Sequence, residues 1–305
     1  MPVVSVVIPL FREGEHLARS VASILQVLQS MGETFELVLV DDGSPDNTWE
    51  QITRLREAHA EITGIRLSRN FGKEAALAAG LDKARGQAVL VMDGDLQHPP
   101  ALIPQMLHLW RSGADVVEAV KRSRGRESIS SRLRAGLFYR IFTRLTGVDI
   151  KGASDFKLMD RRVVDAWQLL RERNLFFRGM NAWLGFNRVQ LPFDVAERAE
   201  GRSSWSLLQL LKLAFTAVTS FSSAPLYMMI FMGLVFIALA LVIGAQTLYM
   251  KFSGLAVDGF TTVILLLLLI GGVLSFGLGL VGVYIARIYE EVKGRPRYII
   301  AEQID

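Results

Sequence analysis

The chain has 305 residues, a net charge of +4 and a pI near 9.4, and it contains no cysteine. The absence of cysteine excludes disulfides, thiolate metal sites and cysteine nucleophiles. The mean hydropathy of +0.32 is high for a chain with 21% charged residues, so the composition indicates a water-soluble part and a membrane part. The mild basic excess suits an anionic membrane surface or a phosphate-bearing substrate, and no nucleic-acid-recognition motif is present, so no nucleic-acid partner is expected.

The first 120 residues alternate apolar runs with helical patterns. Because the strand-like runs are almost wholly apolar, this alternation predicts a mostly parallel sheet covered by helices on both faces. Ser44 and Pro45 are expected to be the N-cap and first residue of the second helix, which continues to about Ala60. Strands are expected at 3–9, 35–44, 64–70, 87–95 and 114–120, and the other helices at 15–31, 73–84 and 100–112.

Four aspartates end two of these strands, Asp41 and Asp42 one of them, and Asp93 and Asp95 the other. Because parallel sheets bind ligands at the carboxyl ends of their strands, these acids are expected to converge on one cleft. Asp93 and Asp95 repel each other, which favours a cation between them, and a hard ion such as Mg²⁺ or Mn²⁺ prefers carboxylate oxygens. Gly94 between them leaves room for a diphosphate.

Each acidic motif also has a plainer interpretation. Most D-x-D triplets are surface loop acids, although the position of residues 93–95 at the end of a buried strand favours a functional role for them. The aspartates of segment 40–48 could accept hydrogen bonds from a base N–H or from ribose hydroxyls. Helix capping is the alternative, and it suits Asp46 best.

Two late segments, 225–250 and 260–286, each exceed the ~20 residues that span a bilayer and carry no charge. Their length and purity make buried helices of a soluble core a poor alternative. Basic residues follow the second segment, so the positive-inside rule predicts that the tail, 287–305, is cytoplasmic. Two spans return the chain to its starting side. The amino end lacks the features of a signal peptide, which also predicts a cytoplasmic catalytic part.

Two further helices are expected at the membrane surface. Segment 131–147 is basic and amphipathic, which is typical of interfacial helices, although an ordinary helix packed on the domain has the same pattern. Segment 203–221 is apolar on most sides and leads directly into the first span.

Six motifs occur in order along nearly the whole chain: "VSVVIPLFREGEHL", "VLVDDGSPDNT", "RLSRNFGKEAAL", "VMDGDLQHPP", "GASDFKLMDRRVV" and "ERAEGRSSW". Together they resemble family 2 glycosyltransferases with a GT-A fold. More narrowly, they resemble the GtrB-like bactoprenol glucosyltransferases and the dolichol-phosphate mannose synthases. The resemblance implies an α/β, Rossmann-like GT-A domain made of residues 1–130 and 148–200. The two interfacial helices and two C-terminal transmembrane helices complete the expected architecture.

The resemblance also implies a reaction, the inverting transfer of a hexose from a nucleotide diphosphate sugar to the phosphate of a membrane polyprenol. The expected donor is UDP-glucose and the expected acceptor undecaprenyl phosphate, at the cytoplasmic face of a bacterial inner membrane, with Mg²⁺ or Mn²⁺ as cofactor. GDP-mannose is the alternative donor. Family members can assemble as oligomers, so a homo-oligomer stays open.

By the same resemblance, residues of the motifs take roles at the donor and at the two phosphates. Asp155 is placed at the reaction centre, with Asp95 and Arg122 as the other catalytic residues. Ser204 stands where the family often has lysine, so Arg202 or Lys212 is expected to supply that charge. The nucleotide-sugar residues are Pro9, Asp41, Asp42, Asp93 and Gln97; the metal ligands are Asp93 and Asp95; the acceptor-phosphate residues are Arg122, Arg198, Arg202 and Ser203.

The acceptor phosphate is already an anion, so it needs positioning and charge neutralisation rather than a strong base. Asp155 is therefore expected to orient groups or to balance arginines. A capping role is the alternative for Asp155, although Asp160 suits it better. Two rival functions are a processive polysaccharide synthase, whose Q-x-x-R-W motif and additional spans are absent, and a non-catalytic nucleotide-binding protein or flippase. Spans without internal charge are a poor transport path.

Overall fold

The computed structural model describes residues 2–95, 97–121, 143–144, 154–170, 172, 177–193, 224–254 and 259–305. The chain forms two compact units, an α/β unit of residues 1–204 and 296–305 and a helical unit of residues 205–295. The expected interfacial helices at 131–147 and 203–221 lie outside the described residues, apart from the helical residues 143–144.

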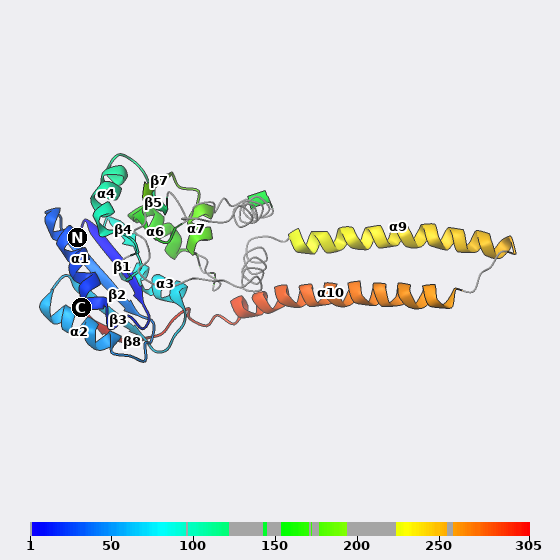
Figure 1. Ribbon diagram of the computed structural model, residues 1–305, viewed down its shortest axis with the longest axis horizontal. Helices are drawn as coiled ribbons and strands as arrows, with labels where there is room; N and C mark the ends of the chain where they lie inside the picture. Colours follow the sequence, from blue (N-terminus) through cyan, green and yellow to red (C-terminus); the bar gives the residue numbers. More distant parts are fainter. Residues whose placement is uncertain are drawn as a thin grey trace. The chain divides into compact units, whose positions relative to one another are not determined.

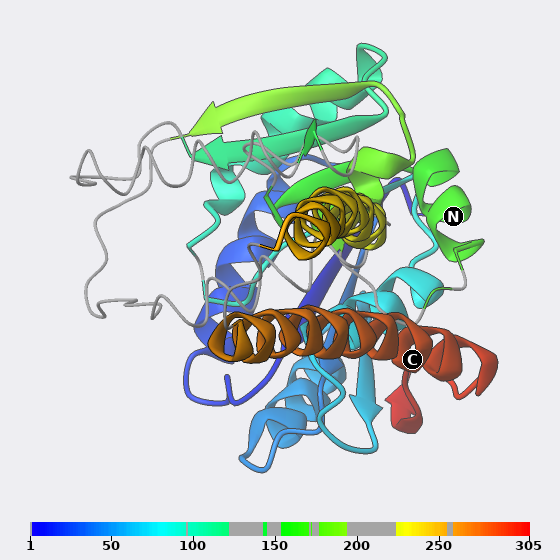
Figure 2. The same ribbon diagram turned by 90° about the vertical axis from the view of Figure 1, so that its right-hand side faces the viewer.

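Within the described residues the α/β unit contains an eight-stranded sheet in the order β7-β5-β6-β4-β1-β2-β3-β8 (Figures 1 and 2). The central strands β4, β1, β2 and β3 are parallel, β6 runs antiparallel to β4 and β5, and β7 is parallel to β5. The predicted mostly parallel α/β sheet is confirmed. The strands are Val4–Leu10 (β1), Phe35–Asp41 (β2), Ile62–Leu67 (β3), Ala88–Val91 (β4), Val116–Lys121 (β5), Lys157–Asp160 (β6), Arg188–Phe193 (β7) and Ile300–Ile304 (β8).

Helices cover both faces of this sheet because successive strand residues point to opposite sides. Val4, Val6 and Ile8 of β1 share one buried cluster with apolar residues of α1, α2 and α4. Helix α3 packs on the other face, where a Cβ added at Gly80 would lie 2.3 Å from Val7. The helices are Leu17–Ser30 (α1), Thr48–Ala58 (α2), Lys73–Lys83 (α3), Ile103–Arg111 (α4), Arg161–Gln168 (α6) and Phe177–Trp183 (α7), with a 3₁₀ turn η1 at Pro100–Leu102.

Helix α2 begins at Thr48, so the prediction that Ser44 is its N-cap was wrong. The Ser44 hydroxyl instead accepts the Arg12 N–H at 3.0 Å, which ties the loop after β1 to the loop after β2. Asp46 supplies a local turn, because its Oδ1 accepts from the Thr48 N–H at 3.3 Å and from the Thr48 hydroxyl at 2.6 Å. Asp160 is the N-cap of α6, where its side chain accepts the N–H of Arg162.

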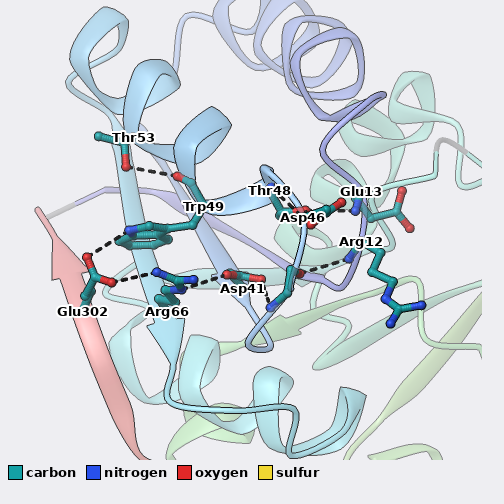
Figure 3. Close-up of polar contacts among 10 residues, drawn as sticks. Arg12, Glu13, Asp41, Asp46, Thr48, Trp49, Thr53, Arg66 and Glu302 are labelled. Carbon is teal, nitrogen blue, oxygen red and sulfur yellow. Dashed lines mark hydrogen bonds and ion pairs between the residues drawn. The ribbon is translucent and has the colours of Figure 1, made fainter.

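The segment predicted as a tail, residues 287–305, contains the end of a helix and a strand of the sheet. Helix α10 continues to Val292, and residues 300–304 return to the sheet as β8, antiparallel to β3. Glu302 of β8 accepts from Trp49 Nε1 at 3.1 Å and from Arg66 Nη1 at 2.9 Å (Figure 3). The C-terminal strand therefore belongs to the α/β unit, beside α2 and β3.

The helical unit contains α9, Ala224–Phe252, and α10, Phe260–Val292. Both helices are long and apolar enough to cross a membrane, over Pro225–Phe252 and Leu269–Val292. Most of their described side chains are exposed to the surroundings. Exposed apolar side chains over this length suit a lipid environment, since in water they would be buried.

Candidate active site

A pocket of about 340 Å³ opens at the carboxyl ends of the central parallel strands. It is formed by the ends of β1 and β4, the loops that follow β1, β2 and β3, and the first turn of α3. This is the edge at which parallel sheets bind ligands. The lining residues are Pro9, Leu10, Phe11, Glu13, Asp42, Asn70, Gly72, Lys73, Ala76, Asp93, Gly94 and Asp95.

The turn after β4 presents Asp93 and Asp95 to this pocket. The Asp93 N–H donates to His98 Nδ1 at 3.2 Å, and Asp95 Oδ1 accepts the Gln97 N–H at 3.0 Å. His98 is itself buried and stacks on Phe156, with ring centroids 4.8 Å apart. A rigid core ring therefore holds the backbone of the acidic turn.

Gly94 fits this turn because its α-carbon faces the end of β1. A Cβ added there would lie 2.8 Å from Leu10 Cδ2, so a larger residue would have to displace that side chain. Because residue 94 has no side chain, a ligand in the pocket can approach the backbone of this turn closely.

Lys73 joins two acids, one that the family resemblance assigns to the metal and one that it assigns to the reaction centre. Its Nζ lies 2.6 Å from Asp93 Oδ1 and 2.9 Å from Asp155 Oδ2. Burial lowers the pKa of Lys73, but the charges of Asp155 and Asp93 outweigh burial and raise it overall, so the side chain is an ammonium. Asp155 lies just before β6 and is 12% exposed, and this contact brings it to the rim of the pocket.

Asp42 shapes the loop that precedes α3. Its Oδ1 accepts the Phe71 N–H at 2.7 Å and its Oδ2 accepts the Gly72 N–H at 2.8 Å. Burial raises the pKa of Asp42, although these two bonds oppose the shift. Gly43 allows the two loops to touch: its φ is 64°, and an added Cβ would lie 2.4 Å from the carbonyl carbon of Arg69.

Asp41 is not among the residues that line the pocket. Figure 3 shows its contact with Arg66. The side chain is fully buried, its Oδ1 accepts the Ser44 N–H at 3.0 Å, and its Oδ2 lies 3.6 Å from Arg66 Nε. That Oδ2 has no hydrogen-bond partner among the described residues. Burial raises the pKa of Asp41, while Ser44 and Arg66 oppose the shift.

The pocket carries an excess of negative charge. Burial together with the charges of Asp95, Asp93 and Asp46 raises the pKa of Glu13, with His16 opposing. Lys73 is the one cation among the described lining residues, which also include four carboxylates. Hard oxygen donors in such an excess suit a divalent cation of the Mg²⁺ or Mn²⁺ type.

The structure brings together most of the predicted residues that it describes. Pro9, Asp42, Asp93 and Asp95 line the pocket, and Asp155 contacts it through Lys73. Neither Gln97 nor Asp41 is part of the lining, although the Gln97 N–H donates to Asp95. The predicted phosphate-binding residues lie outside the described residues: Arg122, Arg198, Arg202 and Ser203, together with Ser204 and Lys212.

Sequence reasoning missed three residues, Glu13, Lys73 and His98. Each belongs to a motif quoted above, and each comes a few residues after the carboxyl end of a strand, β1, β3 and β4 respectively. Lys73 had the clearest signal, because it begins the helix that follows the third central strand, at the carboxyl edge of the sheet.

Comparisons with known proteins agree with this geometry. Residues 5–167 match the sequence model described as glycosyl transferase family 2. An uncharacterized glycosyltransferase of Synechocystis sp. is 39% identical over 301 residues, which cover 98% of this chain and 94% of that protein. The bactoprenol glucosyl transferase of Shigella phage SfV is 35% identical over 302 residues, 98% of each chain.

Among solved structures, mannosyl-3-phosphoglycerate synthase from Rubrobacter xylanophilus aligns with a TM-score of 0.47 and 17% identity over 72% of each chain. The family match covers most of the sheet and the acidic turn, and the relatives match nearly the whole chain. The chain therefore belongs to glycosyltransferase family 2, and it is a glycosyltransferase with a GT-A fold.

Proposed function

We propose that this enzyme transfers glucose from UDP-glucose to the phosphate of a membrane polyprenol, undecaprenyl phosphate, with inversion at the sugar. The observation that carries the proposal is an acidic pocket at the carboxyl ends of the strands, in a chain that also has two helices long enough to cross a bilayer. Relatives that are 35–36% identical over nearly their full length carry the name bactoprenol glucosyl transferase, which supports the choice of sugar and acceptor.

The proposed step forms one bond and breaks one. An oxygen of the lipid phosphate attacks the anomeric carbon, and the bond from that carbon to the donor diphosphate breaks, so UDP leaves with the electron pair. Because the attacking group is already an anion, no proton has to be removed from it. The demand on the protein is to hold two anions close together and in line.

Asp93 and Asp95 would hold Mg²⁺ or Mn²⁺ together with the donor diphosphate. A bound divalent ion neutralises negative charge as the diphosphate departs. No group of three or more histidine, cysteine, aspartate or glutamate side chains is arranged as a metal site in the part of the chain that the structure describes. This fits an ion that takes its remaining ligands from the donor and from water.

Pro9, Asp41 and Asp42 are proposed to hold the nucleoside, with Gln97 beside the diphosphate. Asp42 lines the pocket directly, whereas the buried Asp41, paired with Arg66 at 3.6 Å, would act by supporting the loop after β2 rather than by touching the base. Asp155 is proposed to orient the reacting groups, and its bond to Lys73 gives it a fixed position.

The acceptor phosphate is assigned to Arg122, Arg198 and Arg202 with Ser203, because one guanidinium group can bind two phosphate oxygens in a bidentate contact. The catalytic unit is proposed to face the cytoplasm of a bacterium. Basic residues after the second apolar helix, among them Lys293, Arg295 and Arg297, support that orientation.

A donor and acceptor panel tests the proposal. Purified full-length protein is given UDP-glucose, UDP-galactose or GDP-mannose with Mg²⁺ or Mn²⁺, with and without a short-chain polyprenyl phosphate, and nucleotide release is measured. We expect release from UDP-glucose that requires the lipid phosphate. If GDP-mannose is the one donor from which nucleotide is released, it replaces UDP-glucose in the donor assignment. Nucleotide release at the same rate with and without the lipid phosphate would contradict the acceptor assignment.

A further inference from the structure

The contact of Lys73 with Asp93 has a consequence for metal binding. The ammonium lies 2.6 Å from an oxygen of Asp93, one of the two carboxylates proposed to hold the metal, and it also holds Asp155 at 2.9 Å. A lysine ammonium and a divalent ion next to the same carboxylate repel each other.

We infer that Lys73 occupies the cation position of the acidic pocket in the donor-free enzyme, and that it thereby makes binding of the divalent metal depend on the nucleotide diphosphate. This inference rests on the proposed function, because it assumes that Asp93 is a metal ligand. It adds a positioning residue that neither the sequence motifs nor the relatives' names assign.

The surroundings of Lys73 favour a defined role over a loose surface ion pair. The residue begins α3, and the Gly72 N–H before it is fixed by Asp42. Its two carboxylate partners come from the ends of β4 and β6, and Asp155 is 12% exposed. The Lys73 side chain is itself 43% exposed, but two carboxylates from different segments, one after β4 and one before β6, hold its ammonium at one place.

The charge balance explains the dependence on the donor. Without a nucleotide, the ammonium partly neutralises Asp93 and Asp155, so the pocket binds the metal ion more weakly. A bound diphosphate adds negative charge, which accommodates the ammonium and the metal together. Lys73 would therefore disfavour metal binding before the donor arrives and would keep Asp155 in place throughout.

Direct metal binding tests this without measuring turnover. Mn²⁺ binding to the purified full chain is followed by electron paramagnetic resonance, with and without UDP, for wild type and for Lys73→Met. Lys83→Met is the matched control, because it makes the same change in the same helix outside the pocket lining. Lys73→Arg keeps the charge.

Removing a unit positive charge beside the site is expected to tighten binding of Mn²⁺ alone by about tenfold or more. UDP should enhance Mn²⁺ binding strongly in wild type and less in Lys73→Met, while Lys73→Arg and Lys83→Met resemble wild type. Lys73→Gln, whose amide can still donate to both carboxylates, provides the same comparison if the methionine variant does not fold.

Two outcomes are contrary and separable. Wild type that binds Mn²⁺ with UDP, together with a Lys73→Met or Lys73→Gln variant that binds bare Mn²⁺ no more tightly, would overturn the role of Lys73 alone. Wild type that does not bind Mn²⁺ even with UDP would overturn the metal assignment of the proposed function, and the inference with it.

Discussion

Replacing His98 tests whether the acidic turn depends on the core ring beneath it. His98 Nδ1 accepts the Asp93 N–H at 3.2 Å, and the ring stacks on Phe156 at 4.8 Å with an interplanar angle of 17°. His98→Phe keeps a stacking ring and removes the acceptor. His98→Asn retains an acceptor in a similar position and removes the ring.

The two interactions have different expected costs. An unsatisfied, partly buried N–H costs about 1–3 kcal/mol of unfolding free energy, and loss of the stacked pair costs about 0.5–1.5 kcal/mol. Turnover responds to the position of Asp93, since a shift of about 1 Å in a reacting group can cost on the order of 100-fold. We therefore expect His98→Phe to lose about 10- to 100-fold in turnover, and His98→Asn to lose far less at similar stability.

The assay is nucleotide release at saturating donor and acceptor, with thermal unfolding in detergent measured on the same preparations. His108→Phe is the control, because that histidine is exposed on α4 and lies outside the pocket lining. Full turnover in a folded His98→Phe protein would refute the reasoning, because the acidic turn would then hold its shape without the bond.

Three further predictions follow from other contacts of the α/β unit. Asp95→Asn should lower turnover by at least about 100-fold without changing thermal unfolding, and EDTA should do the same to wild type; an active Asn variant would exclude Asp95 as a metal ligand. The raised pKa of Glu13 means that its ionisation weakens the fold, so stability falls as pH rises from its ordinary value of 4.5 through the raised one. Glu13→Gln should then unfold at a higher temperature than wild type at pH 7.5 in metal-free buffer, with the difference vanishing near pH 4; equal stability at both pH values would contradict this. Glu302→Ala removes the acceptor of Trp49 and Arg66, so it should lower the free energy of unfolding by about 1 kcal/mol at most. Because Arg66 also contacts Asp41, the same change should raise the donor KM, and an unchanged KM would limit β8 to a structural role.

The core of the fold could be predicted because its signals are local. Five apolar runs predicted the positions of β1 to β5, and the acids at their ends predicted the edge that carries the pocket. Strand β8 was not predictable in the same way. Its sequence, "IAEQI", is short, with two polar residues among five. It forms a strand because Ile304 pairs with Gly64 and Glu302 accepts from Trp49 and Arg66, all more than two hundred residues earlier.

The site was predicted in part for the same reason. Asp93 and Asp95 could be found from one triplet, because both carboxylates lie in a single turn. Lys73 acts on Asp93 from a different segment, the start of α3, so only its position in space reveals the contact. His98 lies in the same loop, five residues after Asp93, but the sequence does not show that the chain turns back to bring its ring under the Asp93 N–H. Ser44 shows the opposite error, since a locally favourable capping residue is used instead to join the loops after β1 and β2.

The product itself tests the central claim most directly. Purified enzyme is incubated with UDP-glucose, divalent metal and undecaprenyl phosphate in lipid nanodiscs, and the lipid fraction is analysed by mass spectrometry and for anomeric configuration. The account predicts a hexose joined through a single phosphate to the polyprenol, with the configuration inverted relative to the donor. Free glucose with unchanged lipid, or a lipid that carries a sugar phosphate from the donor, would contradict it.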